Sequence, residues 1–155
     1  MSKSLKRVEA ALAAAGTETE IREVGQARTA QEAADAAGVS VDQIVKSIIF
    51  RGEESGHVVL FLTAGGNRVS AAKASAVAGQ PLGKADAELI RAETGFAIGG
   101  VSPVGHLTPV RSYWDPRLDG FSEIWAAAGT PRHIFRSTPA ELKRITGAAP
   151  ADFTE

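Results

Sequence analysis

Residues 96–106 read Phe-Ala-Ile-Gly-Gly-Val-Ser-Pro-Val-Gly-His, an apolar lead-in followed by three glycines and a proline. Glycine allows main-chain N–H groups to come close to a ligand. Pro103 fixes its own φ and restricts Ser102 to extended conformations, so we expect residues 99–102 to form a preset curve. Such a curve can aim amides at an oxygen atom that gains negative charge during a reaction. The alternative is an ordinary turn, and this stretch alone does not decide between the two.

Lys46 is a second candidate for chemistry, because it lies inside an apolar candidate strand at residues 44–50. Side chains alternate along a strand, which places Lys46 on one face with Ile48 and Phe50. A cation on an apolar face is costly unless it reaches solvent, pairs with an anionic side chain or meets an anionic ligand. The pattern leaves these three interpretations open.

Other common reaction centres do not fit the sequence. The chain has no cysteine, which excludes disulfides, thiolate catalysis and cysteine-based zinc sites. Its three histidines stand far apart and form no metal-binding motif, so we expect neither a metal nor another cofactor. Ser102 superficially matches a Gly-x-Ser-x-Gly nucleophile, but Val104 stands in place of the last glycine, and Pro103 lacks the N–H that an oxyanion hole uses. A serine hydrolase is therefore rejected.

Three segments together resemble the YbaK-type bacterial aminoacyl-tRNA deacylases, which are related to the editing domain inserted in bacterial prolyl-tRNA synthetases. They are the strand with Lys46, the Gly-Gly-Val-Ser-Pro-Val-Gly loop at residues 99–105, and Ala-Ala-Gly-Thr-Pro at residues 127–131, in that family's order. The resemblance extends over nearly the whole chain, from a helix start at Thr29 to a helix end at Gly147.

The resemblance implies a trans-editing hydrolase that removes a small wrong amino acid from a tRNA, with the tRNA for proline as the expected one. The implied catalytic residues are Lys46, Gly99, Gly100, Val101, Ser102 and Pro103. The implied substrate-binding residues are Thr29, Ala30, Phe50, Gly129, Thr130 and Pro131. In this hypothesis the loop stabilises an oxyanion, Lys46 holds the phosphate or ribose end of the terminal nucleotide, and no metal takes part. His133 is either a substrate-facing polar group or a partly exposed strand residue.

A second function class stays open, a non-catalytic module that binds the aminoacyl-adenosine end of a tRNA or a synthetase partner. A pure binding module does not need a loop that stabilises an oxyanion. Lys46 together with the intact glycine loop therefore favours the enzyme. The sequence does not identify which amino acid is removed.

The formal net charge of −1 argues against a broad basic surface, so we expect no DNA binding. Any tRNA contact must be local, from small clusters such as Lys3, Lys6 and Arg7. Prolyl-tRNA synthetase is the expected protein partner. No apolar run is long enough to cross a membrane and the chain starts without a secretory apolar core, so the predicted location is the cytoplasm.

Length and patterning predict one domain, residues 1–155, of the α+β class. Helices are expected over residues 5–15, 30–37, 70–78, 86–91 and 139–146, and strands over residues 21–24, 44–51, 57–63, 107–113, 121–128 and 132–136. The elements interleave without a regular βαβ alternation, which favours a mixed, mostly antiparallel sheet with flanking helices. The resemblance implies the same sheet, curved and barrel-like.

Overall fold

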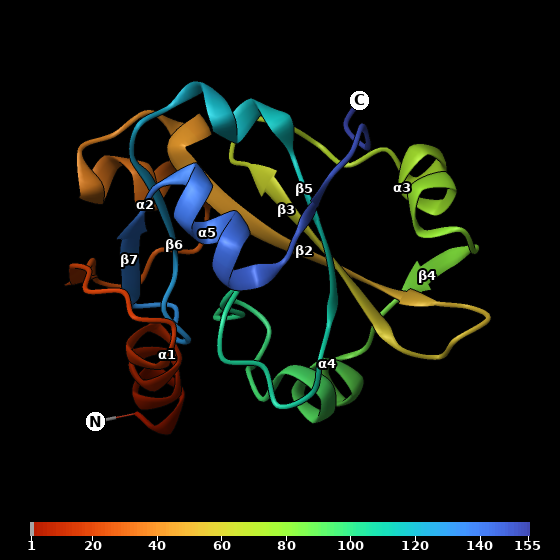
Figure 1. Ribbon diagram of the computed structural model, residues 1–155, viewed down its shortest axis with the longest axis horizontal. Helices are drawn as coiled ribbons and strands as arrows, with labels where there is room; N and C mark the ends of the chain where they lie inside the picture. Colours follow the sequence, from red (N-terminus) through yellow and green to blue (C-terminus); the bar gives the residue numbers. More distant parts are fainter. Residues whose placement is uncertain (1) are drawn as a thin grey trace.

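The computed structural model describes residues 2–155 (Figure 1). Its helices are α1 (Lys3–Ala14), α2 (Ala30–Ala37), α3 (Ala71–Ala78), α4 (Ala87–Thr94) and α5 (Pro139–Thr146), with the 3₁₀ turns η1 (Val41–Gln43) and η2 (Pro116–Gly120). Its strands are β1 (Ile21–Glu23), β2 (Ile44–Gly52), β3 (Val58–Ala64), β4 (Leu82–Lys84), β5 (Arg111–Trp114), β6 (Ile124–Ala127), β7 (His133–Ser137) and β8 (Ala149–Pro150). None of these helices combines the length and apolar character needed to cross a membrane.

The strands form one mixed sheet in the order β1-β7-β6-β2-β3-β5-β8, with β4 attached to β2. The β1–β7, β6–β7, β2–β3 and β2–β4 pairs are antiparallel, and the β2–β6, β3–β5 and β5–β8 pairs are parallel. The predicted class, a curved and mostly antiparallel mixed sheet with helices around it, is confirmed, and the sheet stays open rather than closing into a barrel.

Helices α2, α3 and α5 begin and end close to where the sequence predicts, whereas α1 already begins at Lys3 and α4 continues past the expected end at Arg91 to Thr94. Ser2, Thr29, Ser70, Asp86 and Thr138 each precede a helix and accept a hydrogen bond from an amide of its first turn. Gly38, Gly79, Gly95 and Gly147 end four of the helices in the left-handed conformation. These caps satisfy amides and carbonyls that a helix leaves free at its ends.

The strand predictions near the glycine loop are partly wrong. Residues 107–110 were expected to start a strand, but the amides of Leu107 and Thr108 donate to the carbonyls of Thr94 and Glu93, so this segment turns back onto the end of α4. Strand β5 therefore starts only at Arg111. Strands β4 and β8 have three and two residues, which is too short to show an alternation in the sequence.

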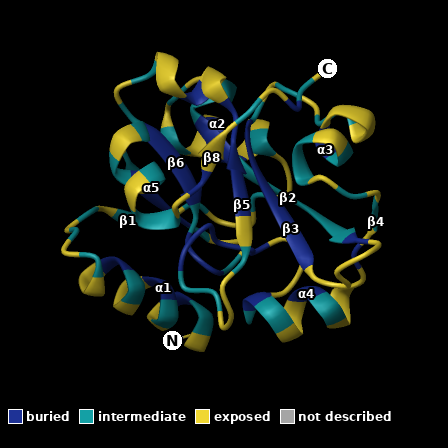
Figure 2. Ribbon diagram, turned by 45° about the vertical axis from the view of Figure 1, so that its right-hand side comes forward, coloured by how far each residue is buried: buried dark blue, intermediate teal, exposed yellow. Residues whose placement is uncertain are grey.

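Alternation along the central strands divides the core between the two faces of the sheet. All seven residues of β3 are buried (Figure 2). Leu60 and Leu62 belong to the cluster that α1, α4 and α5 cover, whereas Val59 and Phe61 pack with α3. A third cluster, including Ile44, lies under α2. Lys46 shares the face of Ile44 and therefore lies between the α2 and α3 clusters.

Asp115, a buried carboxylate, organises the turn that follows β3. One carboxylate oxygen accepts the amide of Ala64 at 3.0 Å and the side-chain amide of Asn67 at 2.9 Å, and the other accepts the amide of Arg117 at 3.0 Å. The side chain joins the end of β3, the turn after it and the start of η2. Three donors satisfy this buried charge without a cation in direct contact.

We expect Asp115→Ala to lower the free energy of unfolding by about 2 to 4 kcal/mol, because the buried amide of Ala64 loses its acceptor. Urea denaturation followed by tryptophan fluorescence measures this change. The matched control is Asp152→Ala, which removes an exposed carboxylate paired with Lys73 and should cost less than about 1 kcal/mol. Equal losses in the two variants would contradict the role of Asp115.

Candidate active site in a gap of the sheet

Strand β2 has an uncovered stretch on one edge. On its other edge it pairs with β3 from Val45 to Arg51. On the uncovered edge it pairs with β6 only at Ile44 and Val45, and with β4 only from Phe50 to Gly52. Residues 46–49 therefore have no strand partner on that edge, and β6 and β4 flank a gap.

The main chain of β2 presents hydrogen-bonding groups to this gap. The amide of Gly52 donates to the His57 carbonyl on the β3 side, and the amide of Glu53 donates to the Pro81 carbonyl on the β4 side. Since the direction of main-chain groups alternates along a strand, Ser47 and Ile49 direct their N–H and C=O groups into the gap.

A cavity of about 530 Å³ lies over the gap. Four segments wall it besides β2: the start of α2 with the residues before it, the region from Lys84 to Ile90, the glycine loop, and residues 127–134. The lining is mostly apolar, with Arg28 and Lys84 exposed at the rim. A largely apolar cavity with a few convergent polar groups is the usual form of a small-ligand site.

The glycine loop turns sharply beside the cavity. Gly99 adopts φ +91°, and the amide of Gly100 donates to the Ala97 carbonyl at 3.0 Å. Within residues 2–155 the amides of Gly99, Val101 and Ser102 have no protein acceptor. Val101 lines the cavity, and its amide is free to bind water or a ligand there.

His106 fixes the far end of this loop. Its Nε2 donates to the Ser102 carbonyl at 2.7 Å, while the Ser102 hydroxyl accepts the amide of Val104 at 3.2 Å. Ser102 is fully buried, so its hydroxyl does not reach the cavity. Burial lowers the pKa of His106 below its usual value, so the neutral imidazole is the form the fold favours.

The glycine loop and the segment at residues 127–131 touch each other. A Cβ placed on Gly100 would lie 3.0 Å from the Cα of Thr130 and 3.1 Å from the carbonyl oxygen of Gly129. Gly129 has φ +93°, and a Cβ there would lie 2.8 Å from the carbonyl oxygen of Ser4. Both positions need glycine because the segments approach main chain to main chain.

Thr130 and His133 add a polar corner to the cavity wall. The Thr130 hydroxyl lies 2.7 Å from Nδ1 of His133 and accepts the amide of Arg132 at 3.1 Å. The Nε2 atom of His133 lies 3.8 Å from a carboxylate oxygen of Glu23.

Lys46 is held by a neutral group rather than by an anion. Its Nζ donates to the Asn67 carbonyl at 2.5 Å, and no carboxylate of the described chain lies within salt-bridge distance. Burial lowers the pKa of Lys46 from its usual value, and nearby Arg68 lowers it further, against the opposing effect of Asp115 and Asp42. An ammonium with free N–H donors and a charge that the fold does not neutralise suits an anionic ligand.

The cavity brings together most of the residues that the sequence analysis singled out. Lys46, Thr29, Ala30, Gly99, Val101, Thr130 and Pro131 line it. Gly100 and Gly129 lie just behind, in the contact between the two loops. Pro103 lines a separate groove near α1 and α5, and Phe50 packs against Phe61 with ring centroids 5.7 Å apart.

Sequence reasoning missed several residues of the wall. Ile98 lines the cavity and is 63% exposed, although it is a large apolar side chain. The one sequence feature that could have identified Ile98 is its place between a short predicted helix and two glycines. Lys84 and Ile90 reach the cavity because β4 pairs with the end of β2. This pairing could not be predicted, because a strand of three residues is too short to show a pattern in the sequence.

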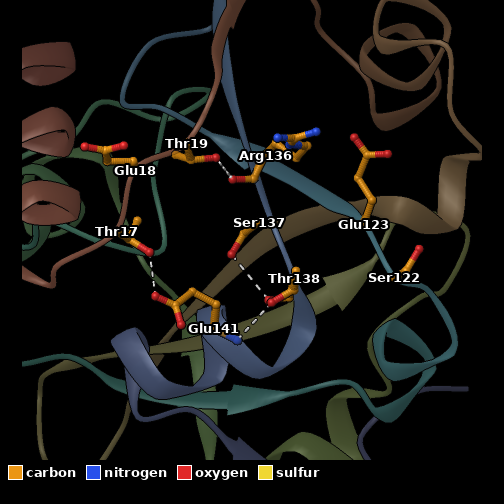
Figure 3. A pocket seen from close by; sticks show the side chains of 9 residues that line it. All are labelled: Thr17, Glu18, Thr19, Ser122, Glu123, Arg136, Ser137, Thr138 and Glu141. Atoms are coloured by element: carbon orange, nitrogen blue, oxygen red, sulfur yellow. Dashed lines mark hydrogen bonds between the residues drawn. The ribbon is translucent and has the colours of Figure 1, made fainter.

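A second, polar cleft of about 410 Å³ lies at the opposite end of β7 (Figure 3). Its side chains are largely engaged with one another: Thr17 donates to Glu141 at 2.5 Å, and Thr19 donates to the Arg136 carbonyl. Hydrogen bonds from Arg144 and Thr17 lower the pKa of Glu141 to about 2. Glu18 and Glu123 also line the cleft, which disfavours an anionic ligand.

Within residues 2–155 no group of three or more His, Asp or Glu side chains is arranged to bind a metal.

Comparison with known proteins identifies the family to which the chain is related. The family model for the aminoacyl-tRNA editing domain matches residues 24–145. The uncharacterised protein YwhH of Bacillus subtilis is 31% identical over 118 residues, which is 76% of this chain and 74% of YwhH.

Two solved structures share the fold. One, described as a candidate trans-editing enzyme for prolyl-tRNA synthetase, is 50% identical with a TM-score of 0.93, covering 100% of this chain and 99% of that one. The other, the hypothetical protein APE2540, is 29% identical with a TM-score of 0.87, covering 96% and 99%.

The depressed pKa of His106 predicts a loss of stability in mild acid. Between this pKa and the unfolded value of about 6.5, the unfolded chain binds a proton that the folded chain does not. The free energy of unfolding should therefore fall as the pH is lowered through this window. Urea denaturation at pH 7.5 and 5.5 should show a smaller fall in His106→Gln than in the unmodified protein. His57→Gln, a change at an exposed histidine, should keep the full fall, and an unchanged fall in His106→Gln would contradict the assignment.

Proposed function

Because this chain belongs to the family of aminoacyl-tRNA editing domains, we propose that it is a trans-editing deacylase. It hydrolyses the ester that joins a wrong amino acid to the terminal adenosine of a tRNA. The resemblance to a candidate trans-editing enzyme for prolyl-tRNA synthetase supports the tRNA for proline as substrate and that synthetase as partner. The proposed place of action is the cytoplasm.

One observation carries this proposal: a single cavity contains both an unneutralised lysine and a loop with free main-chain amides. The ester of an aminoacyl-tRNA needs an attacking water and a stabilised oxyanion. A main-chain or side-chain donor directed at an oxyanion typically contributes roughly 2.7 to 4 kcal/mol to the lowering of the barrier. The loop is therefore sufficient as the main catalytic device.

In the proposed mechanism the amides around Val101 bind the carbonyl oxygen as it becomes negative. Lys46 binds a phosphate or the ribose of the terminal nucleotide and so places the ester against the loop. Water adds to the ester carbonyl carbon, the ester C–O bond breaks, and the proton of the water passes to the departing ribose oxygen. The free ribose hydroxyl next to the ester orients the water in this mechanism, so no carboxylate or imidazole of the protein is assigned as a base. Gly100, Ser102 and Pro103 act from behind the cavity by fixing the shape of the loop.

The selecting part of the cavity is formed by Thr29, Ala30, Thr130 and Pro131, with Gly129 setting the position of the latter two. Phe50 contributes through the core packing of β2 rather than by contact with a ligand. A second, size-limited site is needed because a synthetase separates amino acids that differ by one methylene by only about 1 to 3 kcal/mol. His133 is proposed as a polar group that supports Thr130 at this wall.

The alternative is a binding module without catalysis. A module that only binds an aminoacyl-adenosine end does not need a loop that stabilises an oxyanion. The free amide of Val101 at the cavity therefore favours the deacylase.

We expect the protein to deacylate tRNA for proline charged with at least one of alanine, cysteine, serine, threonine and 2-aminobutyrate. Lys46→Ala should lower the single-turnover rate by about 100-fold or more, because the ester is no longer held against the loop. The matched control Lys73→Ala removes a surface lysine that pairs with Asp152 and should keep the rate. Retained activity in a folded Lys46→Ala protein would contradict the role of Lys46. Binding of the charged tRNA without hydrolysis of any panel member would favour the binding module.

A further inference from the structure

Helix α1 precedes the segment matched by the family model, yet it contacts both loops of the cavity. The Ser4 carbonyl approaches Gly129 so closely that a Cβ there would lie 2.8 Å away. A Cβ on Gly105 would lie 3.3 Å from the carbonyl oxygen of Arg7. The first two turns of α1 therefore pack against the main chain of both loops.

Arg7 makes the most specific of these contacts. Its Nη1 donates to the carbonyl of Gly95 at 3.1 Å, and its guanidinium lies 5.1 Å from the centre of the Phe96 ring. Gly95 ends α4, where the free carbonyls of a helix carry partial negative charge and favour a cation. A Cβ on Gly95 would lie only 2.5 Å from Nη1, so glycine at this position is what lets the guanidinium approach.

The guanidinium of Arg7 contacts this helix end and the Phe96 ring. It forms no ion pair with a carboxylate of the described residues. Its side chain is half-buried, whereas those of Lys3 and Lys6 on the same helix are exposed. Arg7 therefore differs from Lys3 and Lys6, because its side chain packs within the fold whereas theirs are exposed.

The glycine loop leaves α4 at Gly95 and passes α1 again at Gly105, and both points lie against Arg7. Residues 99–102 lie between these two points. Between Gly95 and Gly105 the loop is also held by four other hydrogen bonds. The amide of Phe96 donates to the Thr94 hydroxyl, the amide of Gly100 to the Ala97 carbonyl, the amide of Val104 to the Ser102 hydroxyl, and His106 to the Ser102 carbonyl.

We propose that Arg7 is a positioning residue for deacylation, which acts by fixing the end of α4 and thereby the amides of the glycine loop. The expected effect on the deacylation rate rests on the proposed function, whereas the effect on the conformation of the loop does not. Arg7 acts on the loop and does not touch the tRNA.

The kinetic test compares Arg7→Met with the unmodified protein in single-turnover deacylation at several enzyme concentrations. Methionine keeps much of the aliphatic stem and removes the guanidinium. The maximal rate should fall about tenfold, because displacement of a reacting group by about 1 Å costs up to 100-fold, while the half-saturating concentration stays within twofold. Arg91→Met is the control: it removes an exposed arginine from the last turn of α4 and should leave both parameters unchanged.

Two kinetic results would overturn the proposal. One is an unchanged maximal rate in Arg7→Met. The other is a rise of the half-saturating concentration in both Arg7→Met and Lys6→Met, since that result would assign the N-terminal cations to tRNA binding.

Amide hydrogen exchange provides a readout that does not depend on activity. Arg7→Met should speed exchange in peptides covering residues 96–106 and 127–131, and should leave the β2–β3 hairpin unchanged. Unchanged exchange in the loop peptides would overturn the positioning role. If the unmodified protein hydrolyses no panel member, the proposed deacylase function fails, and the exchange result decides the structural role of Arg7 by itself.

Discussion

The candidate site depends on a mismatch between the length of β2 and the strands that cover one of its edges. β3 pairs with nearly the whole of β2, whereas β6 and β4 take opposite ends of the other edge. Main-chain groups that lack a strand partner cannot be buried under apolar side chains without cost. The surrounding segments therefore frame residues 46–49 instead of covering them, and a cavity results.

The turn that follows β3 also fixes the position of the Lys46 ammonium. Asp115 accepts the side-chain amide of Asn67, and the carbonyl of Asn67 accepts Lys46. A buried carboxylate thus determines where the ammonium is held without neutralising it directly. This arrangement explains how a cation can lie between two apolar clusters and still be free to meet an anion.

The sequence was sufficient for the features that depend on local chemistry. Caps such as Thr29 and Asp86, the glycine helix ends and the hairpin formed by β2 and β3 follow from residue types and spacing. The gap did not follow, because it arises from β4, which has three residues, and from parallel pairing of β2 with β6, which are about 80 residues apart in the chain. Residues 107–110 were predicted as the start of a strand, but hydrogen bonds to the end of α4 decided their conformation. Ser102, Pro103 and Phe50 carried the right motif or face, yet none of the three lines the cavity.

One wall of the cavity consists of main chain, from Ser47 and Ile49 on the exposed edge of β2. Substitution of a side chain leaves a peptide group unchanged, so this wall stays the same in every variant that keeps the strand. The opposite walls, from the start of α2 and residues 127–134, consist of side chains that can vary. The cavity therefore has a main-chain wall that side-chain substitution leaves unchanged and side-chain walls that substitution can alter, and a change of ligand preference by substitution arises in the side-chain walls.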